Sequence, residues 1–590
     1  MLLPHLQRFL TTPVETHRDI RVTFWLCLSI GFALIYSLMG LQEAFSSPWV
    51  IHDDVRSHVF WMWRFIDPQL FPNDLIADYF QSVAPWGYTQ LYKGGIALGF
   101  DPITFNKLLP LPLVLITTGY CFWISMMIFP VPASGFIATL LLNQTIWNTH
   151  DIPSATPRAF IYPLLFGFLY YVMGRSLLPC LITIVLQGLF YPQTLFLSSG
   201  ILILRLVQVH HGRLRLSPDR RDYLFCGLGL ALVFVLLLPY ALKISDYGPA
   251  LTAAEGRTLS TLAGDGRKNF FFDDPLKFWF CGERSGMFPY NWCKFERPPQ
   301  LWGAIALPML LLFPKRFPLA SKISDQSVIL IHLLLSSLGM FFLAHLLLFR
   351  LHLPSRYTKH SIRMVVAIAA GMALILLLEA GLRWAAQRSS NAFGGKILPT
   401  VGCVGLLSII IFGYPALMDR YPNPDYVHSP TPEVYEFLAQ QPADSLVASL
   451  SELANNIPSL AQRSILTASE IANPYHVGYY GQIQQRTEEL MAAQYSLQRR
   501  EVRQFIDTYG VDFWLVDVNA FQPTYILKNS WLRELGTPAV NAIQILESDQ
   551  QPVIERMMRR CDVFRKGGRI LLDAQCILEN VSSGRSQSAQ

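Results

Sequence analysis

Charged residues are scarce in this sequence of 590 residues. They make up only 15% of it, against about 25% in soluble domains, whereas 52% of the residues are hydrophobic. The net charge of +6 is spread over short basic clusters between apolar segments, unlike the continuous basic face of a nucleic-acid-binding protein. Internal repeats, low-complexity tracts and long blocks of charge are also lacking. The composition therefore argues against a wholly soluble protein, gives no support to a nucleic-acid partner and indicates a polytopic membrane protein.

The apolar residues gather in segments of about the length that a membrane-spanning helix needs, roughly 20 residues. We expect an all-α bundle of about eleven transmembrane helices. No small-residue cleavage site follows the first apolar segment, so we expect it to be retained as an anchor. The expected spans are 22–41, 103–129, 131–147, 159–174, 177–191, 194–207, 223–242, 301–313, 328–349, 362–384 and 397–414.

Basic residues are distributed unevenly between the loops of this bundle. If the N-terminus is inside, they collect in the inner segments, whereas the first long outer loop, 42–102, is mainly acidic. This asymmetry follows the positive-inside rule and predicts a cytoplasmic N-terminus. A second outer loop, 245–299, is a candidate lid or acceptor site. The membrane domain is thus expected over residues 1–415.

The residues after the last span have a different pattern. Prolines mark a linker, and Thr431 followed by Pro432 predicts the start of a helix. Apolar runs at 445–450 and 511–516 predict buried strands, and a hairpin is expected within 561–572. Strands that alternate with helices predict an α/β domain over 416–580, which is extracytoplasmic because the number of spans is odd. Residues 581–590 have the composition of a disordered tail.

The nine cysteines divide into two groups. Five fall within expected spans, where a thiol behaves as a small apolar residue. The other four lie on the outer side in two close pairs, and disulfides persist in oxidising compartments. The alternative, four unpaired thiols in a reducing compartment, requires this paired distribution to be accidental. We therefore predict the disulfides Cys281–Cys293 and Cys561–Cys576.

Two adjacent acids, Asp53 and Asp54, come shortly after the first span, with His52 before them and Arg56 after them. Carboxylates at that depth are costly unless they are solvated, paired or catalytic. An N-cap role, worth about 1 kcal/mol, accounts for Asp54 alone but leaves Asp53 and His52 unexplained. Two adjacent carboxylates can hold a divalent cation, with Mg²⁺ or Mn²⁺ as the fitting ions, or one can keep the other at a raised pKa as a base.

The remainder of the first outer loop is aromatic and then acidic. Residues 55–65 are dominated by apolar and aromatic side chains, which we expect at the membrane interface with their rings at headgroup level. Asp74 and Asp78 are expected to be solvated loop acids.

Two further outer turns carry charge. The turn 149–158 either faces the same cavity as Asp53 or is an ordinary polar turn; its charged residues are His150, Asp151 and Arg158. The turn 350–363 is basic on the outer side and needs a counter-charge. A bound lipid phosphate supplies one, because Arg binds phosphate oxygens bidentately and Lys adds a point charge. Attraction to anionic headgroups is the alternative. The candidate phosphate ligands are Arg350, Arg356, Lys359 and Arg363, with Tyr357 in the substrate cavity beside His52 and Arg56.

These features together resemble the C-type glycosyltransferase (GT-C) superfamily of polytopic membrane enzymes, in a bacterial branch of it. The motifs that carry the resemblance are the acids at 53–54, Asp-Pro-Gln-Leu-Phe-Pro-Asn-Asp at 67–74 and Leu-Pro-Ser-Arg-Tyr at 353–357. No Trp-Trp-Asp-Tyr-Gly run is present, so the oligosaccharyltransferase branch is not indicated. Beyond the loop acids, the pattern of protein O-mannosyltransferases does not match either.

The resemblance implies that a sugar moves, with inversion, from a polyprenyl-phosphate-linked donor to a hydroxyl of an acceptor glycan, lipid or protein. It implies that Asp53 or Asp54 is the general base and that Arg356, Lys359 or Arg363 stabilises the departing lipid phosphate. One alternative is a flippase or transporter that moves a lipid-linked or anionic solute without breaking a bond. Another is a scaffold whose outer domain binds partners.

Overall fold

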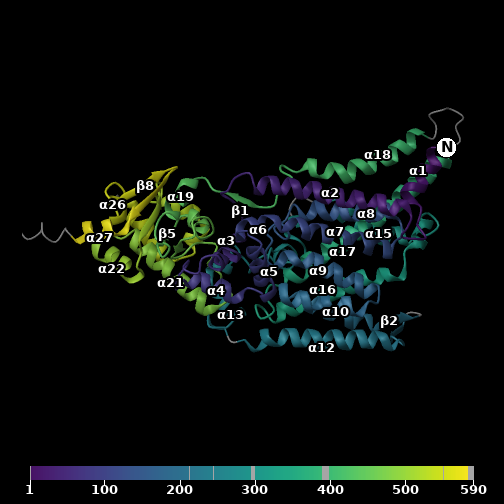
Figure 1. The fold of residues 1–590 in the computed structure, drawn as a ribbon, viewed down its shortest axis with the longest axis horizontal. Coiled ribbons are helices and arrows are strands. Elements are labelled where there is room, and N and C mark those ends of the chain that lie inside the picture. The colour runs from purple at the N-terminus through teal and green to yellow at the C-terminus, as the bar shows by residue number, and fades with distance from the viewer. Residues whose placement is uncertain are drawn as a thin grey trace, which may run out of the picture.

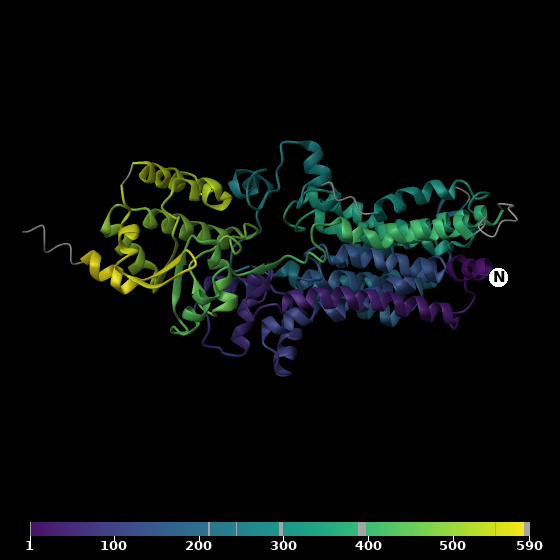
Figure 2. The same cartoon turned by 90° about the horizontal axis from the view of Figure 1, so that it is seen from above.

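A bundle of apolar helices makes up most of the molecule, and a mixed α/β unit lies at one end of it (Figures 1 and 2). The structure, a computed structural model, describes residues 2–210, 213–243, 245–293, 299–387, 397–548 and 550–582. Within these residues, six helices are long and apolar enough to cross a membrane. The chain is therefore a multi-pass membrane protein.

Each apolar segment that the sequence nominates as a span is helical in the structure. Prolines stand in the first turn of several of these helices, where the missing N–H group costs no hydrogen bond. The helices of this bundle are α1 (Leu2–Thr11), α2 (Ile20–Ala44), α6 (Pro102–Leu108), α7 (Pro110–Ile128), α8 (Pro132–Ile146), α9 (Ile161–Met173), α10 (Leu177–Phe190), α11 (Thr194–Arg205), α12 (Arg220–Leu242), α15 (Pro299–Leu311), α16 (Val328–Leu346), α17 (Ser355–Gln387) and α18 (Ile397–Gly413).

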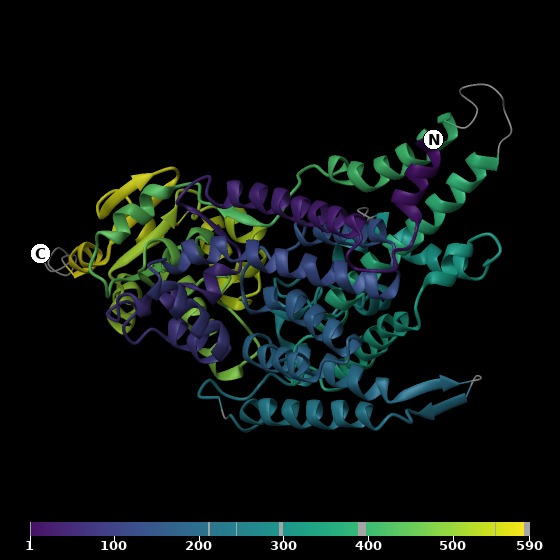
Figure 3. The same cartoon turned by 45° about the vertical axis from the view of Figure 1, so that its right-hand side comes forward.

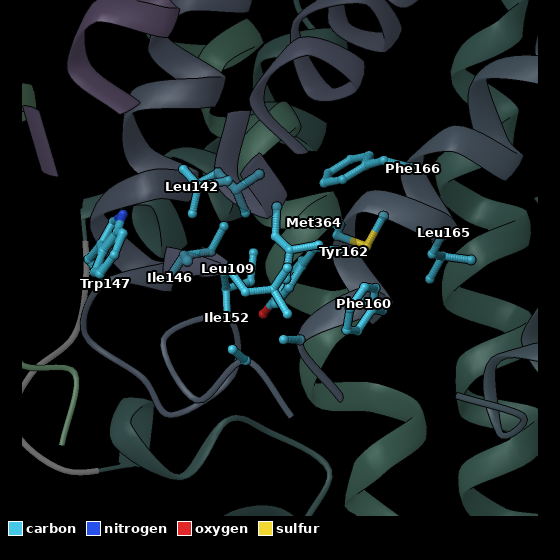
Figure 4. Packing of buried hydrophobic residues seen from close by; sticks show 14 of the residues in the cluster. Leu109, Leu142, Ile146, Trp147, Ile152, Phe160, Tyr162, Leu165, Phe166 and Met364 are labelled. Atoms are coloured by element: carbon cyan, nitrogen blue, oxygen red, sulfur yellow. The ribbon is translucent and has the colours of Figure 1, made fainter. Parts of the chain in front are cut away.

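Helix α17 is the central element of the bundle, because most of its side chains are buried. It packs closely on α8: a Cβ atom added at Gly371 would lie 2.6 Å from the carbonyl oxygen of Ser134. Small residues permit such approach between apolar helices. Figure 4 shows the packed core at the end of α17 nearest the site, where Met364 lies beside Tyr162, with Ile146 and Ile152 close by. This packed core supports the charged residues of the site.

The first outer loop folds into short elements: β1 (Val50–His52), α3 (Val55–His58), η1 (Phe60–Phe65), α4 (Leu75–Val83) and α5 (Trp86–Ala97). Phe60 and Trp61 of its aromatic segment are buried in protein, so the expectation that the rings lie at headgroup level is wrong for them, whereas Trp63 and Phe65 are half-buried. A buried protein core and a membrane interface favour the same residue types. Asp74 is not solvated either, since its carboxylate accepts the N–H groups of Ile76 and Ala77 as an N-cap.

The second outer loop contains α13 (Ala253–Thr258), η3 (Ser260–Leu262), η4 (Lys277–Cys281) and α14 (Tyr290–Cys293). The disulfide Cys281–Cys293 closes its second half. At the opposite end of the bundle, the hairpin of β2 (Val207–His210) and β3 (Arg213–Leu216) precedes α12 and lies across the bundle from the N-terminus (Figure 3). The short helices η5 (Pro318–Lys322) and η6 (Asp325–Ser327) precede α16.

The C-terminal unit contains a five-stranded sheet with the order β6-β5-β7-β9-β8. Strand β5 pairs in parallel with β6 and β7, whereas β9 pairs antiparallel with β7 and β8. The strands and the hairpin lie where the sequence predicts them, and the disulfide Cys561–Cys576 is present. The strands are β5 (Leu446–Ser449), β6 (Ser464–Ile465), β7 (Phe513–Asp517), β8 (Asp562–Lys566) and β9 (Arg569–Asp573).

Helices flank this sheet. Two helices, α21 (Val477–Gln494) and α22 (Arg499–Tyr509), precede β7. The others are η7 (Tyr414–Leu417) in the linker, α19 (Pro432–Ala439), η8 (Glu452–Asn456), α20 (Ile457–Leu460), α23 (Pro523–Lys528), α24 (Ser530–Arg533), α25 (Thr537–Glu547), α26 (Val553–Met557) and α27 (Ala574–Ser582). Of the tail expected to be disordered, residues 583–590 lie outside the described part of the chain, whereas 581 and 582 end α27.

Candidate active site

The two adjacent acids occupy the turn between β1 and α3. Strand β1 pairs antiparallel with β4 (Tyr426–His428), a strand of the linker that follows α18, with Ile51 opposite Val427. The N–H group of Asp53 extends this pairing by donating to the carbonyl of Asp425 at 3.3 Å. This two-stranded ladder fixes the acids between the first outer loop and the C-terminal part of the chain.

Each of the two carboxylates has its own arginine. Asp53 forms an ion pair with Arg56, and Asp54 forms one with Arg158. Asp54 stands at the N-cap position of α3, yet its side chain makes no capping hydrogen bond. The N-cap interpretation of Asp54 is therefore wrong, and its carboxylate is directed toward Arg158 instead.

A cavity of about 350 Å³ opens beside these acids. It is built from the first outer loop, the turn 149–158, the second outer loop, the segment before α17 and the C-terminal unit. The acids and the basic turn, which lie some 300 positions apart in the sequence, therefore border the same space. The charged residues that line it are Asp53, Asp54, Glu283 and Glu470, with His58, His150, Arg158, Arg267, Lys268, Arg284, His352 and Arg356.

Glu470 connects three parts of the chain at this cavity. Its carboxylate pairs with Arg267, lies 3.5 Å from the Nζ atom of Lys268 and lies 3.4 Å from Arg56, the partner of Asp53. Burial alone would raise the pKa of Glu470, but Lys268, Arg267 and Arg56 lower it to about 2. The C-terminal unit thus contributes an ionised carboxylate that holds Arg56 and the second outer loop against the first.

The two acids differ in their affinity for protons. Burial raises the pKa of Asp53, and although Arg56 opposes this shift, the negative charges of Glu470 and Asp54 add to it. Burial also raises the pKa of Asp54, but Arg158, His52, His58 and His150 together lower that pKa below its ordinary value. Asp53 is consequently the better proton acceptor, whereas Asp54 stays ionised beside Arg158.

Arg356 is the cation of the basic turn that lines the cavity. Its side chain is half-buried, and among the residues that the structure describes the guanidinium has no hydrogen-bond or ion-pair partner. Its backbone is fixed, since the N–H group donates to the carbonyl of Leu353 at 3.1 Å. Glu283 lines the same cavity, where Arg284 and Arg356 lower the pKa of its carboxyl against the effect of burial, but Glu283 forms no ion pair with Arg356. The half-buried guanidinium can therefore still bind an anionic ligand.

The other cations of that turn do not join Arg356. Lys359 lies 3.2 Å and Arg363 2.6 Å from the carboxylate of Asp151, which is 1% exposed and also lies 3.2 Å from His360. Asp151 therefore supplies the counter-charge that the sequence leaves unidentified. Arg350 is exposed and does not line the cavity. The structure brings only one of the four expected phosphate ligands to the cavity.

Three of the remaining predicted residues support the site from outside it. The ring of His52 is buried, and its Nδ1 atom accepts the N–H group of Asp54 at 3.1 Å, so this ring positions the backbone of the acids. Burial lowers the pKa of His52 to about 3, which keeps it neutral. Arg56 is bound by Asp53 and Glu470. Tyr357 is buried and donates its hydroxyl to the carbonyl of Leu351 at 2.9 Å.

His150 does border the cavity, where it forms an ion pair with Asp425 of the linker.

The carboxylates do not fit a divalent metal site. Asp53 and Asp54, the expected ligands of Mg²⁺ or Mn²⁺, are each neutralised by an arginine. In the described ranges of the chain, no three His, Cys, Asp or Glu side chains gather as a metal-ligand set. Arg56 and Arg158 thus compensate the charge of the two carboxylates, and no step of the reaction proposed below requires a metal.

The sequence does not point to Glu470, Glu283, Lys268 or His352 as residues of the site. His352 lies in the basic turn 350–363, and Glu283 and Lys268 lie in the outer loop 245–299, but no motif singles these residues out. Glu470 lies in a segment without a motif, and no local pattern links residue 470 to residue 56. Only the shortage of charge gives a hint, because a Lys or Glu side chain in a protein this apolar needs a specific partner.

Acidification is expected to release the contact made by Glu470. Because the pKa of this carboxyl is about 2 in the folded protein and 4.5 ordinarily, its ion pairs stabilise the fold above pH 4.5 and are lost as the pH falls toward 2. The melting temperature of the purified protein should fall over this window, and the fall should be smaller in Glu470→Gln. In Glu436→Gln, which removes an exposed acid, the melting temperature should fall with pH as it does in the unaltered protein. An equal fall in all three proteins would contradict this role.

The bundle, the outer loops and the C-terminal unit define a class of protein: a multi-pass membrane chain with the GT-C fold. The archaeal oligosaccharyltransferase AglB from Archaeoglobus fulgidus, in complex with an inhibitory peptide and a dolichol-phosphate, matches with a TM-score of 0.52 at 10% identity, over 86% of this chain and 72% of its own. The oligosaccharyltransferase of the same organism in complex with Zn and sulfate matches with a TM-score of 0.50 at 11% identity, over 88% and 70%.

ArnT from Cupriavidus metallidurans, bound to undecaprenyl phosphate, has a TM-score of 0.44 at 12% identity, with coverage of 94% of this chain and 98% of its own. No protein-family model matches the chain, and the comparison with curated proteins gives no match. At these identities the likeness is one of fold.

Proposed function

We propose that this protein is a membrane glycosyltransferase that moves a sugar from a polyprenyl-phosphate-linked donor to an acceptor hydroxyl at the outer face of the membrane. The observation that carries the proposal is that one cavity is lined by Asp53, Asp54 and Arg356, whose guanidinium has no ion-pair partner among the described residues. A base and a cation for a departing phosphate are the two groups that this transfer needs. The fold shared with AglB supports the same class of reaction.

In the proposed reaction, Asp53 accepts the proton of the acceptor hydroxyl as its oxygen attacks the anomeric carbon. The bond between that carbon and the phosphate oxygen breaks, and the electron pair leaves with the polyprenyl phosphate, whose charge Arg356 stabilises. Attack from the face opposite the phosphate inverts the anomeric centre. Asp54, held ionised by Arg158, fixes the geometry of the turn.

We further propose a bacterial plasma membrane, a cytoplasmic N-terminus and about eleven spans. The membrane domain is then 1–415, with the loops 42–102 and 245–299 and the domain 416–580 outside. The alternate loops with excess Arg and Lys support this orientation. So does the position of the α/β unit, at the opposite end of the bundle from α1 (Figure 1).

The test is transfer by the purified protein in detergent, supplied with polyprenyl-phosphate sugars and a panel of hydroxyl acceptors. We expect free polyprenyl phosphate and glycosylated acceptor to form in equal amounts. A donor that moves across a vesicle bilayer while no product forms would identify a flippase and end the proposal. Binding of cell-envelope polymer with neither product nor movement would identify a scaffold.

A further inference from the structure

A second charged cavity lies on the C-terminal unit, away from the active site. It has a volume of about 600 Å³, and five arginines from three elements line it. Arg499 begins α22, Arg556 lies on α26 with Arg559 and Arg560 just after it, and Arg565 lies on β8. Glu555 is the only carboxylate among the described residues of its lining. This arginine groove therefore carries a large local excess of positive charge.

Protein groups compensate little of this charge. In the described part of the chain, the side chains of Arg499, Arg559 and Arg560 have neither a hydrogen-bond partner nor an ion-pair partner. Arg565 pairs with Asp562 at 2.9 Å, and Arg556 donates to the carbonyl of Leu497 at 3.5 Å. Like charges gathered without counter-ions repel one another and attract oxyanions, which guanidinium groups bind bidentately.

The remaining wall of the groove is apolar. Val518 is 54% exposed in it, and Phe521 packs its ring against Tyr495 at 5.7 Å between centroids. A volume of about 600 Å³ falls within the range of roughly 300–1,000 Å³ that is typical of sites for organic ligands. Charged groups beside a carbon surface, in a space of this size, suit an anionic organic molecule better than free phosphate.

The location of the groove further restricts the class of ligand that it can bind. Elements α22, α26 and β8 lie at the end of the C-terminal unit that is farthest from the apolar helices (Figures 1 and 3). A headgroup of the bilayer that holds those helices does not reach this end. In the orientation proposed above, on which this inference rests, the groove faces the space outside the cell, where glycan chains are the extended anions that fit both its charge and its carbon surface.

We propose that the arginine groove binds an anionic oligosaccharide, whose sugar units carry phosphate or carboxylate groups. The guanidinium groups of Arg499, Arg559 and Arg560 bind the oxyanions, and the sugar rings contact Val518 and Phe521. The proposal involves no bond making and is independent of the transferase activity. It gives the C-terminal unit a binding function of its own.

Calorimetry on the full chain in nanodiscs of zwitterionic lipid tests the proposal. The probes are an oligogalacturonate, a phosphorylated mannan oligosaccharide, neutral dextran, inorganic phosphate and a single-stranded DNA oligomer. We expect one or both anionic oligosaccharides to bind more tightly than the other three, and the tighter one identifies phosphate or carboxylate as the recognised group. Binding should weaken at higher ionic strength because the contacts are ionic.

Two double variants with the same change in net charge complete the test. Arg559→Gln/Arg560→Gln should weaken oligosaccharide binding about tenfold or more, because charge-assisted hydrogen bonds are lost. Arg500→Gln/Arg533→Gln, at exposed arginines outside the groove, should leave it within about twofold. Binding that both variants weaken equally would overturn the proposal. So would DNA, phosphate or dextran binding as tightly as the oligosaccharides, or no binding of either oligosaccharide.

Discussion

Asp53→Asn is expected to reduce sugar transfer by roughly 10²–10⁴-fold, the usual contribution of a placed general base. The amide keeps the shape of the side chain and can still accept a hydrogen bond from Arg56, so folding should be retained. It cannot accept the proton of the acceptor hydroxyl. Initial rates of polyprenyl phosphate release measure the effect, with the melting temperature as a check on folding.

The matched control for Asp53 is Asp78→Asn. Asp78 belongs to the same outer loop and also pairs with an arginine, Arg64 at 2.6 Å, but it does not line the cavity. Its replacement should leave transfer within about threefold, since exposed ion pairs contribute little. Asp54→Asn should retain more transfer than Asp53→Asn, because its amide oxygen can still accept from Arg158. Full activity in Asp53→Asn would exclude this carboxylate as the base.

The pH profile gives an independent check on Asp53. A base must be ionised, so transfer should rise with pH through the raised pKa of this carboxyl. Since the negative charge of Glu470 contributes to that raised pKa, Glu470→Gln should move the acid limb of the profile to lower pH. An unchanged acid limb would show that Glu470 does not act on Asp53.

Asp151→Asn is expected to destabilise the fold by about 3–5 kcal/mol, the usual cost of removing one partner of a buried ion pair. Asp151 is 1% exposed, and without its charge Lys359 and Arg363 would lose the carboxylate that lies 3.2 Å and 2.6 Å from them. Thermal or denaturant unfolding in detergent measures the loss. A large drop in stability would assign Asp151 to the structure of the bundle rather than to the chemistry.

A second substitution separates these roles of Asp151. In Asp151→Asn/Arg363→Gln one of the uncompensated cations is also removed, so part of the lost stability should return. If Asp151→Asn melts as the unaltered protein does but loses transfer, Asp151 acts in the reaction and the structural assignment fails.

The sequence predicts the bundle well, because a span is defined by its own run of apolar residues. Helix α2 extends the expected 22–41 by only a few residues at each end. The α/β pattern of the tail is also local, so β5, β7 and the closing hairpin lie where they are expected. The aromatic segment after Asp54 is misplaced, because burial under the C-terminal unit and insertion at a membrane surface select the same side chains.

The sequence predicts only part of the site. Asp53, Asp54 and Arg356 are exceptional charges for their positions, and that is enough to nominate them. The partner of a basic residue cannot be read from its neighbours in the sequence. Asp151 lies more than 200 positions before Lys359 and Arg363, and no sequence pattern predicts that they form ion pairs. Glu470 is missed for the same reason, since its partners lie on two other loops.

The ladder between β1 and β4 joins the turn that carries Asp53 and Asp54 to the linker that follows α18. A version cut off after α18 would lose the strand that edges Asp53, the carboxylate of Glu470 and one wall of the cavity at once. The membrane helices alone consequently do not form the complete candidate site. A displacement of the C-terminal unit would therefore also displace the backbone of Asp53 and Asp54.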